Sequence, residues 1–516
     1  MTKLKGAVAA GHSITARTAE SILKEGGNAF DAAVGAQFTA LVVEPVLTSL
    51  GGGGFLFAEK DTGKQEVYDF FVQTPIKKSK AENLDFHPIS ADFGETKQEY
   101  RIGAGAVAVP GLVKGLFDIH RNLCSFPIKR LAEEAIYLAR NGVKMNSFQS
   151  GIFEIVKPIY ESSDSALDIF KSKASPGDVI NEGETLIQPE LANTLEILVK
   201  DGCQEFYGGE IAESAVSVTE EPHGHLSRRD FESYRVIHRE PLKLKYKGNS
   251  IALNPPPGSG GLLIAFSLKL LESLGGDVPK FGSSDHIIQL AEIQRMTDSA
   301  RVESLVEHKI KMDESLLDKE FLNLYRDQIL ERVKAFKGTT QISVADGYGN
   351  KASLTSSNGE GSGIMIPGTG IMLNNMLGEE DLNPGGFHQW KPDSRVSSMM
   401  TPGLLKMKNN KTIVFGSGGS NRIRSAILQL ILNITDHDMS LSDAVNAPRV
   451  HFERGKLNAE GGIDFESVSQ LESRYPDQKI WMNKSLFFGG AHSVCVHGKR
   501  YSGVGDTRRG GASLVL

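Results

Sequence analysis

The sequence predicts a layered α/β sandwich built on antiparallel sheets. Two strands are expected at residues 342–345 and 351–356, and they flank the five-residue connection DGYGN at 346–350. Glycine and asparagine in this connection supply the positive φ angles that a hairpin needs. Helical patterns lie on both sides of these strands, without the strict alternation of strand and helix that a parallel sheet requires. Hairpin strands between helix-rich flanks favour helices packed on antiparallel sheets.

The helical patterns are clearest in three segments. Residues 16–45 predict a helix up to Glu25, a stop at Gly26-Gly27-Asn28 and a second, alanine-rich helix whose small side chains can pack tightly. Apolar side chains recur at helical spacing in residues 285–301, and residues 422–434 give another apolar helix. No internal repeat or low-complexity linker divides the chain, so one continuous fold is the simpler interpretation.

The composition is that of an ordinary globular protein. A chain of 516 residues could hold about three domains, on a prior of roughly 150 residues per domain, or form one large α/β unit. Hydrophobic residues make up 40% and charged residues 23%, which disfavours disorder. The net charge is −6 and the basic residues form no stripe, so neither nucleic acid nor an anionic membrane is expected as a partner.

The cysteines and histidines suggest neither a disulfide framework nor a metal site. Three cysteines (Cys124, Cys203 and Cys495) lie far apart and without CxxC spacing. No HExxH motif or cluster of ligands at metal-binding spacing occurs, so no metal and no cofactor are expected. No apolar run is long enough for a signal peptide or a membrane span. A cytoplasmic location is therefore the expectation.

The chemistry is expected at Gly338-Thr339-Thr340. A threonine hydroxyl is a poor nucleophile unless a base lies beside it, and a chain-terminal threonine can use its own α-amine as that base. The unperturbed pKa of an α-amine, about 7.7–8.0, suits general-base catalysis near neutral pH. Thr339 would gain such an amine if its hydroxyl attacked the Gly338 carbonyl and the resulting ester hydrolysed. The alternative is that these β-branched residues merely begin a strand.

The surroundings of this tripeptide favour the first interpretation. The segment GTTQISVADGYGNKASLTSSN resembles the processing site of γ-glutamyltranspeptidases, in which a small subunit begins at the nucleophilic threonine. Further motifs follow in the order of that family: ILKEGGNAFDAAVGAQ, LGGGGFL, VPGLVKGL, NPPPGSGG, GTGIMLNN, RVSSMMTP, GSGGSNRI, DAVNAPRVH and GDTRRGGAS. The resemblance implies a four-layer αββα sandwich of the N-terminal nucleophile hydrolase type. It also implies a large region, 1–338, and a small catalytic region, 339–516, that form one intertwined unit after self-cleavage.

The resemblance carries catalytic roles to particular residues. Gly419 and Ser420 match the positions whose backbone amides stabilise the oxyanion, a contribution of typically a few kcal/mol for each donor. Ser356 matches the hydroxyl that supports the nucleophile, in a segment that is two residues shorter here. Thr340 matches a position behind the nucleophile that is often threonine.

Other residues are expected to bind the substrate. Asn358 matches an amide that contacts it, and Ser397 and Ser398 match a double serine that binds its α-carboxylate. Glu379 takes the place of the acidic residue that accepts the α-ammonium.

Two positions depart from the family pattern for a glutamyl substrate. The arginine that pairs with the glutamyl α-carboxylate falls at Phe71, so a bidentate carboxylate clamp is missing. The polar residue three positions before Glu379 becomes Met376. The residues expected to carry the chemistry are retained, but those expected to bind the glutamyl group are altered. The identity of the substrate therefore stays open.

The first functional expectation is an amidohydrolase or acyltransferase that cleaves a γ-glutamyl compound such as glutathione through a threonine acyl-enzyme. An acylase or amidase for another small amide is the second. A processing-deficient relative that binds without catalysis is the third. The partners expected are a small-molecule amide and the two fragments of the chain itself, and association into homo-oligomers is left open.

Overall fold

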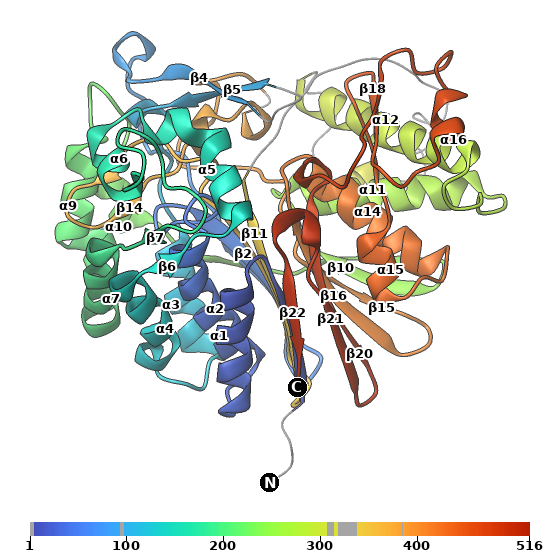
Figure 1. Cartoon of the computed structure of the whole chain (residues 1–516), viewed down its shortest axis with the longest axis horizontal. Helices are drawn as coiled ribbons and strands as arrows, with labels where there is room; N and C mark the ends of the chain where they lie inside the picture. The colour runs from blue at the N-terminus through green and yellow to red at the C-terminus, as the bar shows by residue number, and fades with distance from the viewer. Residues whose placement is uncertain (1–4, 93–96, 307–313, 318–337, 384) are drawn as a thin grey trace.

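The chain forms four layers, in which two antiparallel sheets lie face to face between two layers of helices (Figure 1). The computed structural model describes residues 5–92, 97–306, 314–317, 338–383 and 385–516. The predicted sandwich is therefore confirmed, including the four-layer order that the family resemblance implied. Both termini of the sheet-forming chain lie in the same sheet, because β1 and β22 are neighbours.

The first sheet has seven strands in the order β22-β1-β11-β12-β2-β3-β8, each antiparallel to its neighbours. Its strands are β1 (Gly6–Ala10), β2 (Gly53–Glu59), β3 (Gln65–Phe70), β8 (Ile237–Arg239), β11 (Thr340–Asp346), β12 (Lys351–Ser357) and β22 (Ala512–Val515). The predicted hairpin is confirmed as β11 and β12. Its turn is held by the Asp346 carboxylate, which accepts hydrogen bonds from three backbone amides of the connection.

The second sheet has six strands in the order β21-β20-β16-β15-β10-β9 and is also antiparallel throughout. Its strands are β9 (Leu242–Tyr246), β10 (Asn249–Leu253), β15 (Gly403–Lys406), β16 (Lys411–Gly418), β20 (Gly490–His497) and β21 (Arg500–Val504). Strands β16 and β20 pack against β11 of the first sheet. This contact brings the end of β16 close to the start of β11.

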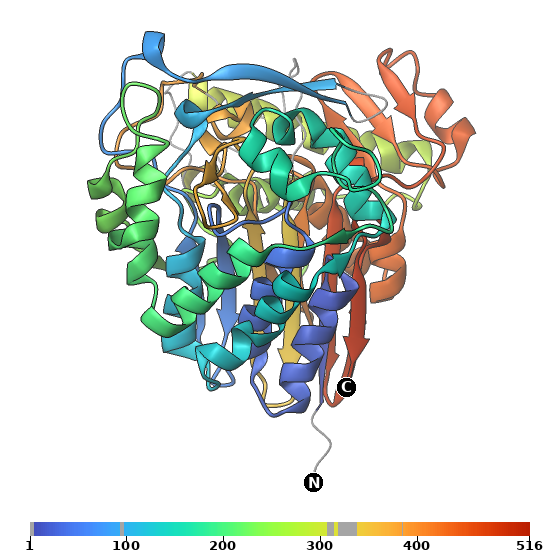
Figure 2. The ribbon, with the colours of Figure 1, turned by 60° about the vertical axis from the view of Figure 1, so that its left-hand side comes forward.

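Helices cover the outer face of each sheet (Figures 1 and 2). The first sheet carries α1 (Ser13–Lys24), α2 (Ala29–Val43) and α3 (Leu112–Leu123), with α4 (Ile128–Asn141) and α7 (Pro189–Asp201) outside them. The second sheet carries α11 (Ser259–Leu274), α14 (Arg422–Thr435) and α15 (Leu441–Asn446), and α12 (Ser284–Val306) packs on α11. The smaller elements are α5 (Ser147–Tyr160), α6 (Asp164–Phe170), α8 (Gln204–Gly208), α9 (Glu210–Ser217), α10 (Arg228–Ser233), α16 (Phe465–Ser469), β4 (His87–Asp92), β5 (Lys97–Ile102), β6 (Val143–Lys144), β7 (Thr185–Leu186), β13 (Met365–Ile366), β14 (Ile371–Met372), β17 (Val450–Glu453), β18 (Lys456–Ala459) and β19 (Gln478–Ile480).

Helix α2 shows why the alanine-rich pattern was informative. All 15 of its residues are buried, and Asn28 caps its first turn in a reciprocal pair with Asp31. A β-carbon built on Gly35 would lie 2.2 Å from Cδ1 of Ile22, so the two helices approach too closely for a side chain there. The small residues thus let α1 and α2 pack as one layer on the first sheet.

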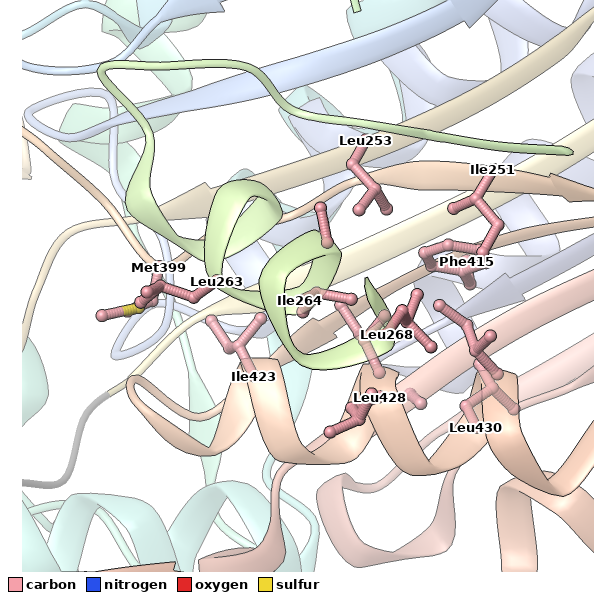
Figure 3. Close-up of a cluster of buried hydrophobic side chains, with 14 of the residues drawn as sticks. Ile251, Leu253, Leu263, Ile264, Leu268, Met399, Phe415, Ile423, Leu428 and Leu430 are labelled. Atoms are coloured by element: carbon pink, nitrogen blue, oxygen red, sulfur yellow. The ribbon is translucent and has the colours of Figure 1, made fainter. Parts of the chain in front are cut away.

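The core on the other side is built from aliphatic side chains. Figure 3 shows Ile251 and Leu253 of β10 and Phe415 of β16 facing side chains from α11 and α14, which include Leu268 and Leu428. Burying each such side chain is worth about 1.5–3 kcal/mol of transfer free energy. Among the residues described, no helix combines the length and the apolar composition that crossing a bilayer needs.

Candidate active site

Thr339 immediately precedes β11, and it lines a pocket between the two sheets. The pocket encloses about 320 Å³, including its opening to solvent. Its walls come from both sides of residue 338 in the sequence. They are formed by Phe71, Thr339, Ser357, Met376, Glu379, Asp381, Leu382, Ser398, Met399, Met400, Ser420 and Ile423.

The backbone of Gly338 takes part in three hydrogen bonds, two of them at the carbonyl group that precedes Thr339. The Thr339 hydroxyl donates to the Gly338 carbonyl oxygen at 2.6 Å, and the Ser357 hydroxyl donates to the same oxygen at 2.8 Å. On the other side of this residue, the Gly338 backbone amide donates to Oε1 of Glu360 at 2.5 Å. All four residues are buried. The nucleophilic atom expected from the sequence therefore lies against the carbonyl group that it would attack.

The predicted oxyanion turn adjoins this peptide. Strand β16 ends at Gly418, where a β-carbon would lie 2.2 Å from the Thr339 carbonyl oxygen. Gly419 has φ +123° and Ser420 has φ +54°, a left-handed conformation that costs a non-glycine residue of order 1–3 kcal/mol. The Ser420 hydroxyl donates to Oδ2 of Asp381 at 2.8 Å, which ties the turn to the pocket wall.

A buried cation lies close behind the turn. A β-carbon on Gly419 would be 3.2 Å from Nη2 of Arg509. Burial lowers the pKa of Arg509 to about 10, while nearby Glu360 and Asp506 act in the opposite direction. Its guanidinium is therefore still charged at neutral pH. A positive charge at this place favours negative charge that develops at the turn.

The hydroxyl group expected to support Thr339 is not that of Ser356. Ser356 does not reach the pocket: its hydroxyl donates to Oε1 of Gln37 at 2.9 Å and lies 2.9 Å from the Thr48 hydroxyl. Successive side chains of a strand point to opposite faces. Since Thr340 pairs with Ser356, the next residue along, Ser357, lies opposite Thr339 and on its side of the sheet. Counting outward from the hairpin turn would have located it.

The same alternation places Thr340 away from the pocket. Its hydroxyl donates to Oε2 of Glu44 at 2.6 Å, and Thr15 donates to the other oxygen at 2.9 Å. Burial of this carboxyl group raises the pKa of Glu44 to about 7, against the lowering effect of the two hydroxyl groups. Thr340 and Glu44 thus support the start of β11 on the face opposite to the pocket.

The predicted substrate-binding residues divide into two groups. Phe71, Glu379 and Ser398 line the pocket, as does Met376. Asn358 does not: its amide donates to the Met372 carbonyl oxygen at 3.3 Å. Ser397 is half-buried and also lies outside the pocket lining, whereas the three residues that follow it, Ser398, Met399 and Met400, all line the pocket.

Phe71 forms a fixed wall. Its backbone amide donates to Oδ1 of Asp69 at 3.1 Å, and its carbonyl oxygen accepts hydrogen bonds from the Tyr234 hydroxyl at 2.7 Å and from Arg395. Its ring stacks on Phe55 with 5.5 Å between centroids. The Arg395 guanidinium is thus engaged behind Phe71, and it does not stand in the pocket for the missing arginine.

Sequence reasoning missed four residues that the structure brings to the site: Ser357, Glu360, Asp381 and Arg509. Ser357 follows from the register of the hairpin and Arg509 lies in the GDTRRGGAS motif, whereas Glu360 lies beyond the end of β12 and outside the paired strands. Asp381 gave no signal, because its partner Ser420 is 39 residues away in the sequence. Within the described part of the chain, no group of three or more His, Cys, Asp and Glu side chains could hold a metal ion.

Two antiparallel sheets between helical layers, with a threonine at the start of a central strand, define the class of N-terminal nucleophile hydrolases. The crystal structure of a cephalosporin acylase from Bacillus halodurans shares this fold, with a TM-score of 0.86 over 99% of this chain and 96% of that chain at 23% identity. The structure of γ-glutamyltranspeptidase from Helicobacter pylori matches 62% of this chain and 90% of its own, with a TM-score of 0.53 and 27% identity.

Comparison of sequences gives the family. The model of the family described as γ-glutamyltranspeptidase matches residues 15–516. A glutathione hydrolase proenzyme from Pseudomonas aeruginosa is 30% identical, over 99% of this chain and 94% of its own length. The Acylase ACY 1 proenzyme of Pseudomonas sp. strain V22 is 31% identical, over 91% of this chain and 86% of its own. The chain belongs to the γ-glutamyltranspeptidase family, and it is an enzyme of the amidohydrolase and acyltransferase type.

Proposed function

We propose that Thr339 becomes the N-terminal nucleophile of a two-fragment amidohydrolase after the chain cleaves itself at Gly338. The observation that carries this proposal is the contact between the Thr339 hydroxyl and the Gly338 carbonyl group, with Ser357 as a second donor to the same oxygen. The fragments would comprise residues 1–338 and 339–516. That two relatives are named proenzymes supports the same division.

Turnover would follow two balanced steps. The Thr339 oxygen forms a bond to the substrate carbonyl carbon, the C–N bond breaks, and the hydroxyl proton passes through the α-amine to the leaving nitrogen. Water then forms a bond to the same carbon, the ester bond to Thr339 breaks, and a proton returns to the hydroxyl. The amides of Gly419 and Ser420 would hold the oxyanion in both steps. Transfer to another amine in place of water would give the acyltransferase reaction.

Mapping the N-termini of the purified protein tests this mechanism. We expect a new terminus at Thr339, and no cleavage and no amide hydrolysis in Thr339→Ala. A terminus elsewhere, or cleavage that persists in the alanine variant, would overturn the proposal. Intact full-length protein after prolonged incubation would favour the third expectation, a relative that binds without processing.

The default substrate is a γ-glutamyl amide such as glutathione. The name of the Pseudomonas aeruginosa relative supports it, as does Glu379, an acidic residue of the pocket lining that would accept an α-ammonium group. This proposal predicts hydrolysis of γ-glutamyl-p-nitroanilide. The substrate proposal does not depend on the location of the protein or on its oligomeric state. The cytoplasmic location stays a prediction that cell fractionation would test, and sedimentation would measure the oligomeric state.

A second candidate is an acylase for a different small amide. Phe71 favours it, because an apolar ring held rigidly at the arginine position offers nothing to a carboxylate. Met376, Leu382, Met399, Met400 and Ile423 make most of the remaining wall apolar. Hydrolysis of other anilides without hydrolysis of the γ-glutamyl compound would decide for this candidate.

A further inference from the structure

The lining of the pocket offers carboxyl groups to a ligand but no cation. Glu379 and Asp381 supply two carboxyl groups, and the other lining residues are apolar or carry hydroxyl groups. Among the described residues that form the lining, none is lysine, arginine or histidine. A ligand in this pocket therefore meets acceptors for a cation, whereas hydroxyl groups such as that of Ser398 are the side-chain donors that it offers to an anion.

The arginines around the pocket are engaged outside its lining. Arg395 donates to the Phe71 carbonyl oxygen from behind the ring of Phe71. Arg422 stacks on Phe487, 4.5 Å from the ring centroid. Arg509 lies behind the turn that is expected to hold the oxyanion. None of the three guanidinium groups lines the pocket, so a carboxylate on an acyl chain finds no bidentate partner there.

Glu379 lies close to the groups that hold the scissile carbonyl group. Ser357, which donates to the Gly338 carbonyl oxygen, accepts a hydrogen bond from the Gly359 amide at 3.0 Å. A β-carbon on Gly359 would lie 2.2 Å from Oε1 of Glu379, so this carboxyl group packs directly on the Gly359 backbone. The carbonyl oxygen of Glu379 accepts a hydrogen bond from the Asn383 side chain at 2.8 Å, which fixes the backbone. An acyl chain that extends from the nucleophile into the pocket can therefore reach this carboxyl group.

An ammonium group suits this position better than a carboxylate does. The two oxygens of a carboxylate offer about four acceptor sites, so a ligand ammonium can join the partners that Glu379 has within the protein. A hydrogen bond between an ammonium and a carboxylate is roughly twice as strong as one between neutral groups. Glu379 is 1% exposed, so little water screens the charges near it. A ligand carboxylate beside it would therefore be repelled.

We infer, on the basis of the Thr339 mechanism proposed above, that the enzyme recognises its acyl group by an ammonium group held by Glu379 and not by a carboxylate. Its substrates are then amides of γ-amino acids. In a γ-glutamyl amide, the third carbon from the scissile carbonyl group carries both an ammonium and a carboxylate. A 4-aminobutyryl amide keeps the ammonium and has hydrogen in place of the carboxylate, which suits the apolar ring of Phe71 in the pocket wall.

The test compares four p-nitroanilides on the processed wild-type protein, with rates corrected for spontaneous release in enzyme-free buffer. The 4-aminobutyryl compound carries the ammonium alone, the glutaryl compound the carboxylate alone, the γ-glutamyl compound both groups and the butyryl compound neither. We expect kcat/KM for the 4-aminobutyryl compound to equal or exceed that for the γ-glutamyl compound. It should exceed those for the glutaryl and butyryl compounds by at least about tenfold, since a site built for a polar group rejects ligands that lack it.

Three results would overturn the inference and leave the proposed Thr339 mechanism standing. The first is faster turnover of the γ-glutamyl or glutaryl compound than of the 4-aminobutyryl compound, which would mean that the pocket binds the carboxylate. The second is equal turnover of the 4-aminobutyryl and butyryl compounds. The third is a protein that gains the terminus at Thr339 but hydrolyses none of the four compounds. A wild-type protein with no new terminus and no turnover would instead overturn the proposed function, and the inference with it.

Variants locate the preference. Glu379→Gln keeps the size of the side chain and removes its charge, so the ratio of 4-aminobutyryl to butyryl turnover should fall several-fold. Glu380→Gln removes an exposed charge at the neighbouring position and should keep the wild-type ratio. An unchanged ratio in Glu379→Gln would overturn the assignment of Glu379. If that variant does not mature, the wild-type ratios decide the substrate class.

Discussion

At the scale of single residues, the site depends on which face of β12 each serine occupies. The Ser357 hydroxyl donates a hydrogen bond to the Gly338 carbonyl oxygen and accepts one from the Gly359 amide at 3.0 Å. It is therefore oriented before any reaction. A donor fixed in this way lowers the cost of charge that develops on the carbonyl oxygen. Ser356, on the other face, belongs to the contact between the sheet and α2.

Ser357→Ala should slow self-cleavage by roughly 10²–10³-fold, the range found when one oxyanion donor is removed. Ser356→Ala should cleave at a rate close to wild type and lose about 1 kcal/mol of stability, because it deletes hydrogen bonds to Gln37 and Thr48. Time courses of chain cleavage on denaturing gels would measure both. If Ser356→Ala slowed self-cleavage and Ser357→Ala did not, Ser356 would be the supporting hydroxyl, as expected from the sequence.

Glu44 gives a residue-scale prediction that depends on pH. Burial raises its folded-state pKa from 4.5 to about 7. The stability that the neutral carboxyl group contributes is therefore complete below about pH 4.5 and is lost as the pH rises through about 7. The loss amounts to roughly 3 kcal/mol.

The measurement compares urea unfolding of Thr339→Ala with that of Thr339→Ala/Glu44→Gln, so that a single uncleaved chain unfolds. At pH 5 the glutamine variant should have the lower free energy of unfolding. At pH 8 the difference in free energy of unfolding should have shifted in favour of the glutamine variant by up to about 3 kcal/mol. A difference between the two proteins that does not change with pH would show that Glu44 titrates normally.

At the scale of elements, the turn from β16 to α14 is shaped by groups outside it. Ser420 holds a left-handed conformation, and its hydroxyl bonds to Asp381 in the short helical turn η5 (Glu380–Leu382). Arg301 of α12 donates to the Asp381 carbonyl oxygen at 2.9 Å and to Oδ1 of Asn421 at 3.3 Å. One helix thus bridges the pocket wall and the turn, so the position of the amides proposed to hold the oxyanion depends on three separate elements.

Asp381→Ala should free the turn and lower kcat by about tenfold or more while changing KM less, because the amides act on charge present only in the transition state. Glu380→Ala, at the exposed neighbouring position, serves as the matched control and should keep both constants. Steady-state kinetics on any hydrolysed anilide would separate the two effects. A rise in KM alone would assign Asp381 to substrate binding.

At the scale of the whole molecule, the two sides of the proposed cleavage site share both sheets. In the first sheet β1 lies between β22 and β11, and β12 pairs with β2. In the second sheet β10 pairs with β15. Strands from residues 1–338 therefore pair with strands from 339–516 in both sheets, within continuous ladders. Separation of the fragments would break these ladders and expose both cores.

The cleaved protein should therefore migrate as one species. We expect the fragments to co-elute in size-exclusion chromatography without denaturant, at the volume of the uncleaved Thr339→Ala protein, and to separate only under conditions that unfold the sheets. Elution of either fragment alone from native protein would contradict the shared-sheet arrangement.

The sequence by itself determined the fold class, the hairpin, the packed pair of helices and the position of Thr339. These depend on local patterns, namely turn residues, apolar periodicity and ordered motifs, which act over a few residues of chain. Thr339, Phe71, Glu379, Ser398 and Ser420 reach the same pocket, as the family resemblance implied.

Only the tertiary structure decided which neighbours complete the site. Ser357, and not Ser356, contacts the Gly338 carbonyl oxygen, because a shift of one residue along a strand turns the side chain to the other face. The tertiary structure also turned Thr340 and Asn358 away from the pocket, and it added Asp381 and Arg509 from distant segments. Such contacts depend on the packing of two sheets and several helices, and no local pattern in the sequence encodes which side chains meet when they pack.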